Sequence, residues 1–104
     1  IGNDYGYENV FAREIEAIAT SADMLIAITT SGNSGNILKA LESAKEANVP
    51  AVVLTGAGRG MLDDATETLN VPSTDTARIQ ECHILIGHII CGIVEENIFS
   101  ELKP

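Results

Sequence analysis

Basic residues are scarce in this sequence: six lysines and arginines stand against 15 aspartates and glutamates, a net charge of −9. Nucleic acids are bound by clustered Lys and Arg, so this balance argues against nucleic acid as a partner. Cysteine is also scarce. Cys82 and Cys91 lie on one expected helix, separated by a rise of ~13.5 Å that no disulfide spans. We therefore expect reduced thiols buried among Ile and Val, in a cytoplasmic protein.

Long apolar runs and targeting patterns are missing as well. No run approaches the roughly 20 residues that cross a bilayer, and no signal-peptide pattern is present, so we expect a soluble protein without a membrane partner. The first residue is Ile1 rather than methionine, which suggests a segment of a longer protein. With 104 residues, 45% of them hydrophobic, the sequence predicts one small globular domain.

The apolar pattern predicts an α/β domain. Helices are expected at residues 8–19, 36–47 and 77–99, and short strands at 24–29, 50–55 and 68–71, with a weak helical turn at 61–65. Because helices alternate with apolar strands, we expect a three-layer α/β/α sandwich around a parallel sheet. Three strands make a thin sheet, so a missing N-terminal part is expected to supply more.

The expected helix at residues 77–99 is apolar nearly all round, with isoleucines, a leucine, a valine and both cysteines on more than one stripe. A helix of this kind must be buried on most of its sides. In so small a chain, we expect another subunit to bury it at the centre of an oligomer.

The most informative segment is the turn ITTSGNSGN at residues 28–36, between an expected strand and an expected helix. Such a turn suits a phosphate, because free N–H groups and the positive end of the helix dipole meet the anion there and hydroxyls add donors. The alternative is an ordinary turn in which Ser34 or Asn36 caps the helix. The lysine of a P-loop is missing, so a phosphomonoester such as a sugar phosphate fits better than a nucleoside triphosphate.

A second glycine-rich segment, Gly56-Ala57-Gly58-Arg59-Gly60, fails the dinucleotide fingerprint because Met61 stands at the third glycine position. It is expected to be a loop at the carboxyl end of a strand, where α/β folds place ligands. We expect Arg59 to be solvated rather than to contact substrate.

The last expected helix carries the polar residues Gln80, Glu81, His83 and His88. His88 lies in ILIGHII, where an unpaired ring is costly. It is either a core histidine bonded to a carbonyl, or a metal ligand or general acid/base. Gln80 and His88 lie ~12 Å apart along the helix axis, so one shared metal requires both side chains to lean toward it. Alternatively, they serve different sites across a subunit interface.

Four segments together resemble the phosphoheptose (sedoheptulose 7-phosphate) isomerases of the sugar isomerase (SIS) superfamily. They are GNDYGYENVFAREIEA (2–17), ITTSGNSGNILKAL (28–41), VVLTGAGRGM (52–61) and VPSTDTARIQECHILIGHIICGIVE (71–95). The resemblance implies one SIS domain with a Rossmann-like sheet over residues 1–104, forming the C-terminal portion of the family's chain. It also implies a homotetramer that converts sedoheptulose 7-phosphate to D-glycero-D-manno-heptose 7-phosphate for bacterial heptose synthesis.

The resemblance also assigns site residues. Asn3 and Asp4 would line the sugar site, and four hydroxyl residues would hold the phosphate: Thr29, Thr30, Ser31 and Ser34. The family commonly has serine where this chain has Thr29, and the hydroxyl is kept.

On the last helix, the resemblance makes Gln80 a substrate contact and a zinc ligand, and His88 a zinc ligand and the acid/base group. The reaction implied is proton transfer between C1 and C2 through an enediol. Some members have an aspartate where this chain has Ala77, and Asp75 is a candidate replacement.

The family's first phosphate-binding turn, a zinc-ligand histidine and a catalytic glutamate are expected before Ile1. The segment alone is therefore expected to be inactive. The alternative function is a non-catalytic relative with the same fold, a regulatory protein that binds a sugar phosphate or a replication-initiation protein.

Overall fold

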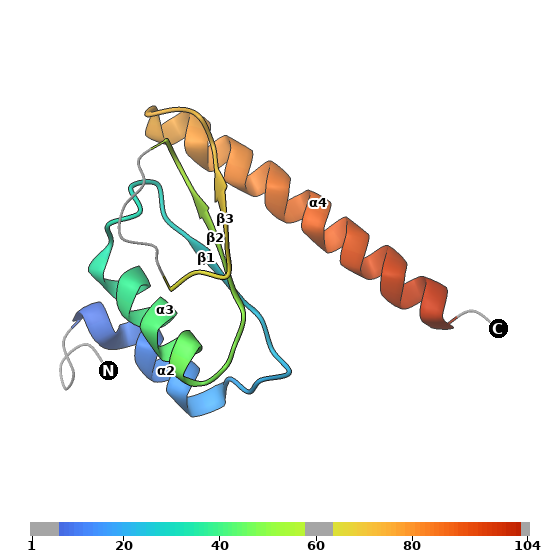
Figure 1. Ribbon diagram of the computed structural model, residues 1–104. Coiled ribbons are helices and arrows are strands. Elements are labelled where there is room, and N and C mark those ends of the chain that lie inside the picture. The colour runs from blue at the N-terminus through green and yellow to red at the C-terminus, as the bar shows by residue number, and fades with distance from the viewer. Residues whose placement is uncertain (1–6, 58–63, 103–104) are drawn as a thin grey trace.

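A computed structural model describes residues 7–57 and 64–102 of the chain (Figure 1). Helices and strands alternate along most of it, as the apolar pattern predicts. In chain order the elements are η1 (Tyr7–Asn9), α2 (Val10–Ile18), β1 (Leu25–Ile28), α3 (Gly35–Glu46), β2 (Ala51–Thr55), β3 (Glu67–Asn70) and α4 (Thr76–Leu102). The first helix is shorter than expected because a 3₁₀ turn, η1, precedes it. Most of the turn expected at 61–65 lies outside the described residues.

The described strands form a parallel sheet in the order β1-β2-β3. Leu25 of β1 pairs with Ala51 of β2, and Val52 of β2 pairs with Glu67 of β3. Helices α2 and α3 pack together on one side of the sheet, and α4 crosses its other side and meets it at β2 (Figure 1). The expected parallel α/β/α arrangement is therefore confirmed for the described part of the chain.

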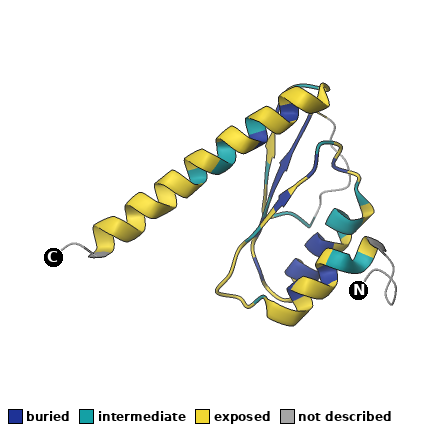
Figure 2. Cartoon of the chain, turned by 180° about the vertical axis from the view of Figure 1, so that it is seen from behind, coloured by how far each residue is buried: buried dark blue, intermediate teal, exposed yellow. Residues whose placement is uncertain are grey.

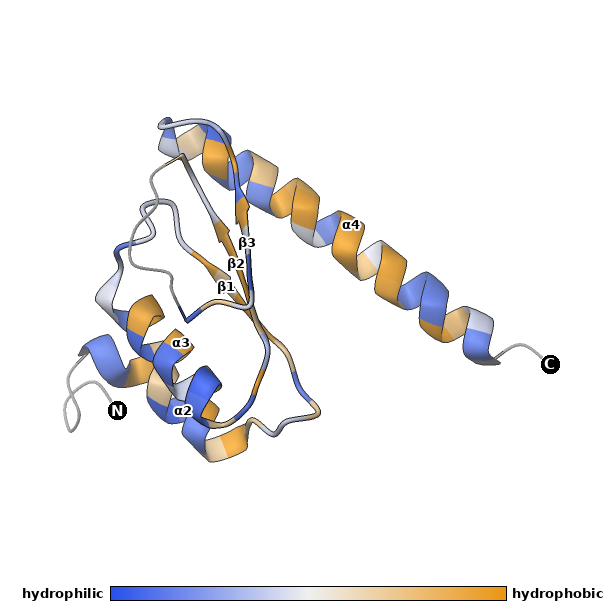
Figure 3. Ribbon diagram, viewed as in Figure 1, coloured by the Kyte–Doolittle hydropathy of each residue, from blue (hydrophilic) through white to orange (hydrophobic). Residues whose placement is uncertain are grey.

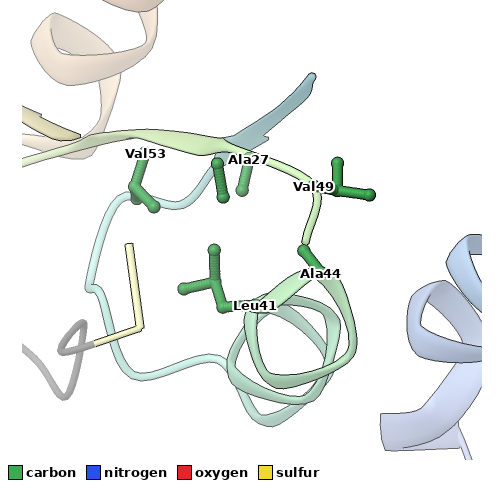
Figure 4. Packing of buried hydrophobic residues seen from close by; sticks show 6 residues of the cluster. Ala27, Leu41, Ala44, Val49 and Val53 are labelled. Atoms are coloured by element: carbon green, nitrogen blue, oxygen red, sulfur yellow. The ribbon is translucent and has the colours of Figure 1, made fainter. Parts of the chain in front are cut away.

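The core lies between α3 and the sheet. Leu41 and Ala44 of α3 face Ala27 of β1 and Val53 of β2, with Val49 at the edge of the cluster (Figure 4). Leu41, Ala44 and Val53 are at most 1% exposed, so the central strand and α3 form a closely packed unit. This unit fixes the carboxyl ends of β1 and β2, from which the candidate site is built.

Helix α4 is 27 residues long and only its first turns are covered (Figure 2). Ile79 and His83 are its only described buried residues, and every residue from Cys91 to Glu101 is exposed. Its hydrophobic residues continue far beyond the sheet (Figure 3). Among the described residues of α4, the exposed large apolar side chains are Ile84, Leu85, Ile89, Ile93, Val94, Ile98 and Phe99.

Two expectations about this helix are wrong for the chain by itself. Both cysteines were expected to be buried, but Cys82 is only partly buried and Cys91 is exposed. The reason is that α4 projects away from the sheet. By length and composition alone, the segment Thr76–Glu101 is also long and apolar enough to cross a membrane, contrary to the expectation that no run approaches this length. A mostly buried core helix of a soluble protein meets the same criterion, whereas 6% of this segment is buried within the chain.

Candidate functional site

The turn after β1 closes on the hydroxyl of Thr29. The backbone N–H of Thr29 donates to Leu54 O at 2.9 Å, which continues the β1–β2 pairing by one residue. Its buried Oγ1 accepts from the Gly32 N–H at 3.2 Å and lies 3.1 Å from Ser34 Oγ. Gly32 has a φ of 76°, a conformation that glycine adopts without a steric cost. The turn is therefore held by its own hydroxyls.

The Ser34 side chain does not cap α3, so the part of the alternative that made Ser34 a cap is wrong. Ser34 occupies the N-cap position but makes no side-chain capping hydrogen bond, and its hydroxyl faces Thr29 instead. Asn36 does bond locally, since its Oδ1 accepts from the Ile37 N–H at 2.9 Å. Ser31 is exposed, with its Oγ accepting from the Asn33 N–H at 3.1 Å. The hydroxyls thus gather at the positive end of the α3 dipole, where an anion is stabilised.

Gly56 is the point at which the turn, the loop after β3 and the start of α4 meet. A Cβ at this buried glycine would lie 2.8 Å from Thr30 O, 2.6 Å from Ile79 Cδ1 and 3.3 Å from Ser73 O. Only a residue without a side chain allows this approach. The glycine-rich pattern predicts a loop near ligands at Gly56 but not this packing role, for which a glycine directly after a buried strand is the available signal.

Helix α4 brings the two predicted residues Gln80 and His88 to one hollow of about 540 Å³. Both Gln80 and His88 are exposed. Ile28, the last residue of β1 and the neighbour of Thr29, lines the same hollow. The start of the turn at residues 28–36 (the hydroxyl turn) and helix α4 therefore line a common space through Ile28, Gln80 and His88, which the resemblance implied and local spacing did not show.

The core histidine of α4 is His83, not His88. His83 is 3% exposed and its Nε2 lies 3.0 Å from the carbonyl oxygen of Thr55. His88 is exposed, so the interpretation of His88 as a core histidine is wrong within this chain, and its ring is open to a ligand. The reason is tertiary: only the first turns of α4 lie against the sheet, and His88 stands beyond them.

The described residues do not by themselves fit a zinc ion. No group of three or more His, Cys, Asp or Glu side chains suited to a metal occurs in residues 7–57 and 64–102. Gln80 and His88 are eight residues apart on one continuous helix, ~12 Å along its axis, whereas zinc ligands lie at about 2 Å from the ion. A zinc site that uses them needs further ligands from elsewhere.

Three predicted residues lie outside the described part of the chain: Asn3, Asp4 and Arg59. Asp75 is described, and its Oδ1 accepts from the Ala77 N–H at 3.0 Å. Its carboxylate therefore lies at the N-terminus of α4, where it stabilises the helix. Nothing in its contacts makes it a substitute for the aspartate that some relatives carry at the Ala77 position.

Comparison with known proteins gives close relatives over nearly the whole chain, although no family model matches. Phosphoheptose isomerase 2 of Campylobacter jejuni is 55% identical over 102 residues, which are 97% of this chain and 51% of the relative. The phosphoheptose isomerase of Aneurinibacillus thermoaerophilus is 56% identical over 100 residues, 95% of this chain and 50% of the relative. The chain thus spans about half the length of the curated relatives it matches.

Solved structures agree with this comparison. The phosphoheptose isomerase of Neisseria gonorrhoeae superposes with a TM-score of 0.84 at 44% identity, covering 90% of this chain and 54% of that one. The enzyme of Francisella tularensis gives the same TM-score at 42% identity, covering 91% of this chain and 52% of that one.

The parallel sheet and the hydroxyl turn at the end of β1 form an α/β domain similar to that of the two solved phosphoheptose isomerases. With this identity and this fold, the chain belongs to the phosphoheptose isomerase family. Membership of this family is consistent with a soluble protein.

Proposed function

We propose that the complete protein carrying this sequence converts sedoheptulose 7-phosphate to D-glycero-D-manno-heptose 7-phosphate. The observation that carries the proposal is the shared hollow: Ile28, at the start of the hydroxyl turn, lines it together with Gln80 and His88 of α4. A phosphate at the turn would thereby direct the sugar along α4.

In this proposal the turn holds the phosphate and α4 carries the chemistry. Thr29 shapes the turn from its buried position, while Thr30, Ser31 and Ser34 supply hydroxyls beside the first N–H groups of α3. Gln80 contacts the sugar, and Asn3 and Asp4 line the same site.

His88 is the acid/base group of the proposal. Proton transfer between C1 and C2 through an enediol needs a side chain that both accepts and donates protons, and imidazole does so near neutral pH. Exposure of His88 on the hollow leaves its ring accessible to the substrate.

The oligomer, the metal and the location of the protein belong to the same proposal. Seven described residues of α4 are large, apolar and exposed, which is more than a soluble monomer ordinarily presents along one helix, and packing against other copies in a homotetramer would cover them. Zinc is proposed with Gln80 and His88 among its ligands, completed by residues from outside the described part of the chain. A cytoplasmic location is proposed with it, and the net charge of −9 disfavours nucleic acid as a partner.

The test is direct conversion. The complete protein is incubated with sedoheptulose 7-phosphate, and the anomeric proton of the aldose product is followed by NMR. Appearance of the aldoheptose 7-phosphate supports the proposal. Binding of the sugar phosphate without conversion would contradict it and favour the non-catalytic regulatory relative.

A further inference from the structure

We infer that His83 is a positioning residue, which fixes α4 against the end of β2 and so sets where Gln80 and His88 stand relative to the hydroxyl turn. This inference rests on the proposed function. The contact that carries it is the 3.0 Å approach of His83 Nε2 to Thr55 O, made by a side chain that is 3% exposed.

The hydrogen bond shows which ring nitrogen carries a hydrogen. A carbonyl oxygen only accepts, so Nε2 is the donor, and in the neutral ring Nδ1 is then an acceptor. Nδ1 is buried, and no described residue donates to it. A buried acceptor without a donor destabilises the folded state, so this histidine does not serve stability well.

The strand does not need the histidine either. Thr55 O already accepts from the backbone N–H of Val71 at 3.0 Å. If His83 were removed, this carbonyl would keep a partner, and a leucine of similar bulk would fill the space without a buried unpaired nitrogen. We infer that the histidine serves orientation instead: its hydrogen bond fixes the direction of α4 relative to β2.

The contact between His83 and Thr55 lies where the orientation of α4 relative to the sheet is set. Ile79 and His83 are the only described buried residues of α4, so the closest packing of the helix in the described chain lies at these two residues. The apolar contacts of Ile79 tolerate sliding and rotation, whereas a hydrogen bond restricts both distance and angle. Gln80 lies one turn before His83 on the same helix, and His88 follows by five residues.

The backbone of β2 connects the His83–Thr55 contact to the turn after β1. Thr55 precedes Gly56, whose missing side chain admits Thr30 O and Ile79 Cδ1. The backbone N–H of Thr29 bonds to Leu54 O, the neighbour of Thr55. A shift of α4 at His83 therefore changes the distance from the turn to Gln80 and His88, and a misplacement of about 1 Å can reduce turnover about 10²-fold.

The experiment compares His83→Leu and His83→Gln in the complete protein, with Val49→Ala as a control. Val49 is buried in the core between α3 and the sheet, far along the chain from α4, so its truncation lowers stability without touching the His83 contact. We expect His83→Leu to keep or raise Tm while kcat falls about 10- to 100-fold with little change in KM. His83→Gln, whose amide can donate to Thr55 O, should recover most of kcat, and Val49→Ala should lower Tm without the loss of kcat.

Three results would overturn the inference: unchanged kcat in His83→Leu, a fall of Tm in parallel with kcat, or equal losses in the leucine and glutamine variants. A crystal structure of His83→Leu provides a readout that does not depend on turnover. We expect α4 to rotate or shift so that Gln80 moves relative to Ile28, and an unmoved helix would contradict the inference. Absence of conversion by the unmodified protein would instead contradict the proposed function, and the crystal structure would still decide the role of His83.

Discussion

The hydroxyl oxygens of Thr29 and Ser34 lie 3.1 Å apart across the turn between β1 and α3. Ser34 holds the N-cap position of α3 without using its side chain as a cap, so this hydroxyl belongs to the turn rather than to the helix. Together with the Gly32 N–H, which donates to Thr29, the pair gives the turn a fixed shape. A preformed turn at a helix N-terminus binds a phosphate without first having to be ordered.

The first prediction concerns the hydroxyls of this turn. Ser31→Ala combined with Ser34→Ala should weaken sugar-phosphate binding by ~1–3 kcal/mol, the range for hydrogen bonds lost to a charged group. Calorimetric titration of the complete protein with sedoheptulose 7-phosphate measures the change. Ser21→Ala, in the exposed loop after α2, is the matched control and should bind as the unmodified protein does. Equal affinity in all three proteins would show that the turn is structural only.

The second prediction concerns His88. His88→Ala should abolish isomerisation in practice, because loss of a general acid/base typically lowers kcat about 10²- to 10⁴-fold. Since His88 is exposed in the chain and pairs with no described core residue, folding and assembly should be preserved. Steady-state assays and sedimentation together make the test, with Glu96→Ala on the same helix as control. Near-normal turnover by His88→Ala would remove the residue from the proposed chemistry.

The third prediction concerns the junction at Gly56. Gly56→Ala places a methyl group 2.8 Å from the Thr30 carbonyl oxygen and 2.6 Å from Ile79 Cδ1, so backbone must shift. We expect a loss of about 1–3 kcal/mol in the free energy of unfolding, the usual cost of overpacking. Denaturant titration measures it.

A glycine on α4 supplies the control for that substitution. A Cβ at Gly92 would meet nothing within 4 Å, and the residue lies in the interior of α4. Gly92→Ala should therefore gain up to about 1 kcal/mol from helix propensity. A Gly56→Ala variant as stable as Gly92→Ala would show that the turn and α4 are not in close contact at this point.

The fourth prediction concerns the exposed apolar residues of α4. Ile89 and Ile93 are 52% and 54% exposed, and the proposed tetramer buries them. Ile89→Asp combined with Ile93→Asp should dissociate the assembly, because charges would have to be desolvated in an apolar interface. Sedimentation velocity follows the change, and Ser100→Asp adds a charge to the same helix as a control. A fully assembled double variant would place the interface elsewhere.

Much of the fold could be predicted because apolar spacing directly reflects which face is buried. The strand expected at 24–29 is observed at Leu25–Ile28, and the helix expected at 36–47 is observed at Gly35–Glu46. The continuous apolar run of β2 correctly indicated a strand covered on both faces. These elements form where the local pattern predicts them because their tertiary contacts favour the same secondary structure.

The site was only partly predictable, and the histidines show why. His83 and His88 both stand among isoleucines on a helix that is apolar nearly all round, so periodicity does not distinguish the buried ring from the exposed one. Which of them meets the sheet depends on where α4 leaves β2, a tertiary relationship absent from the sequence pattern. The contact of Gly56 with Thr30 is of the same kind, since it joins segments 26 residues apart in the chain.

In the proposed site, the turn after β1 holds the phosphate and α4 contacts the sugar. A crystal structure of the complete protein with sedoheptulose 7-phosphate tests both placements at once. We expect the phosphate at the hydroxyls of residues 29–34 and the first N–H groups of α3, with C1 and C2 of the sugar toward His88. A phosphate bound elsewhere, with the turn empty, would contradict it.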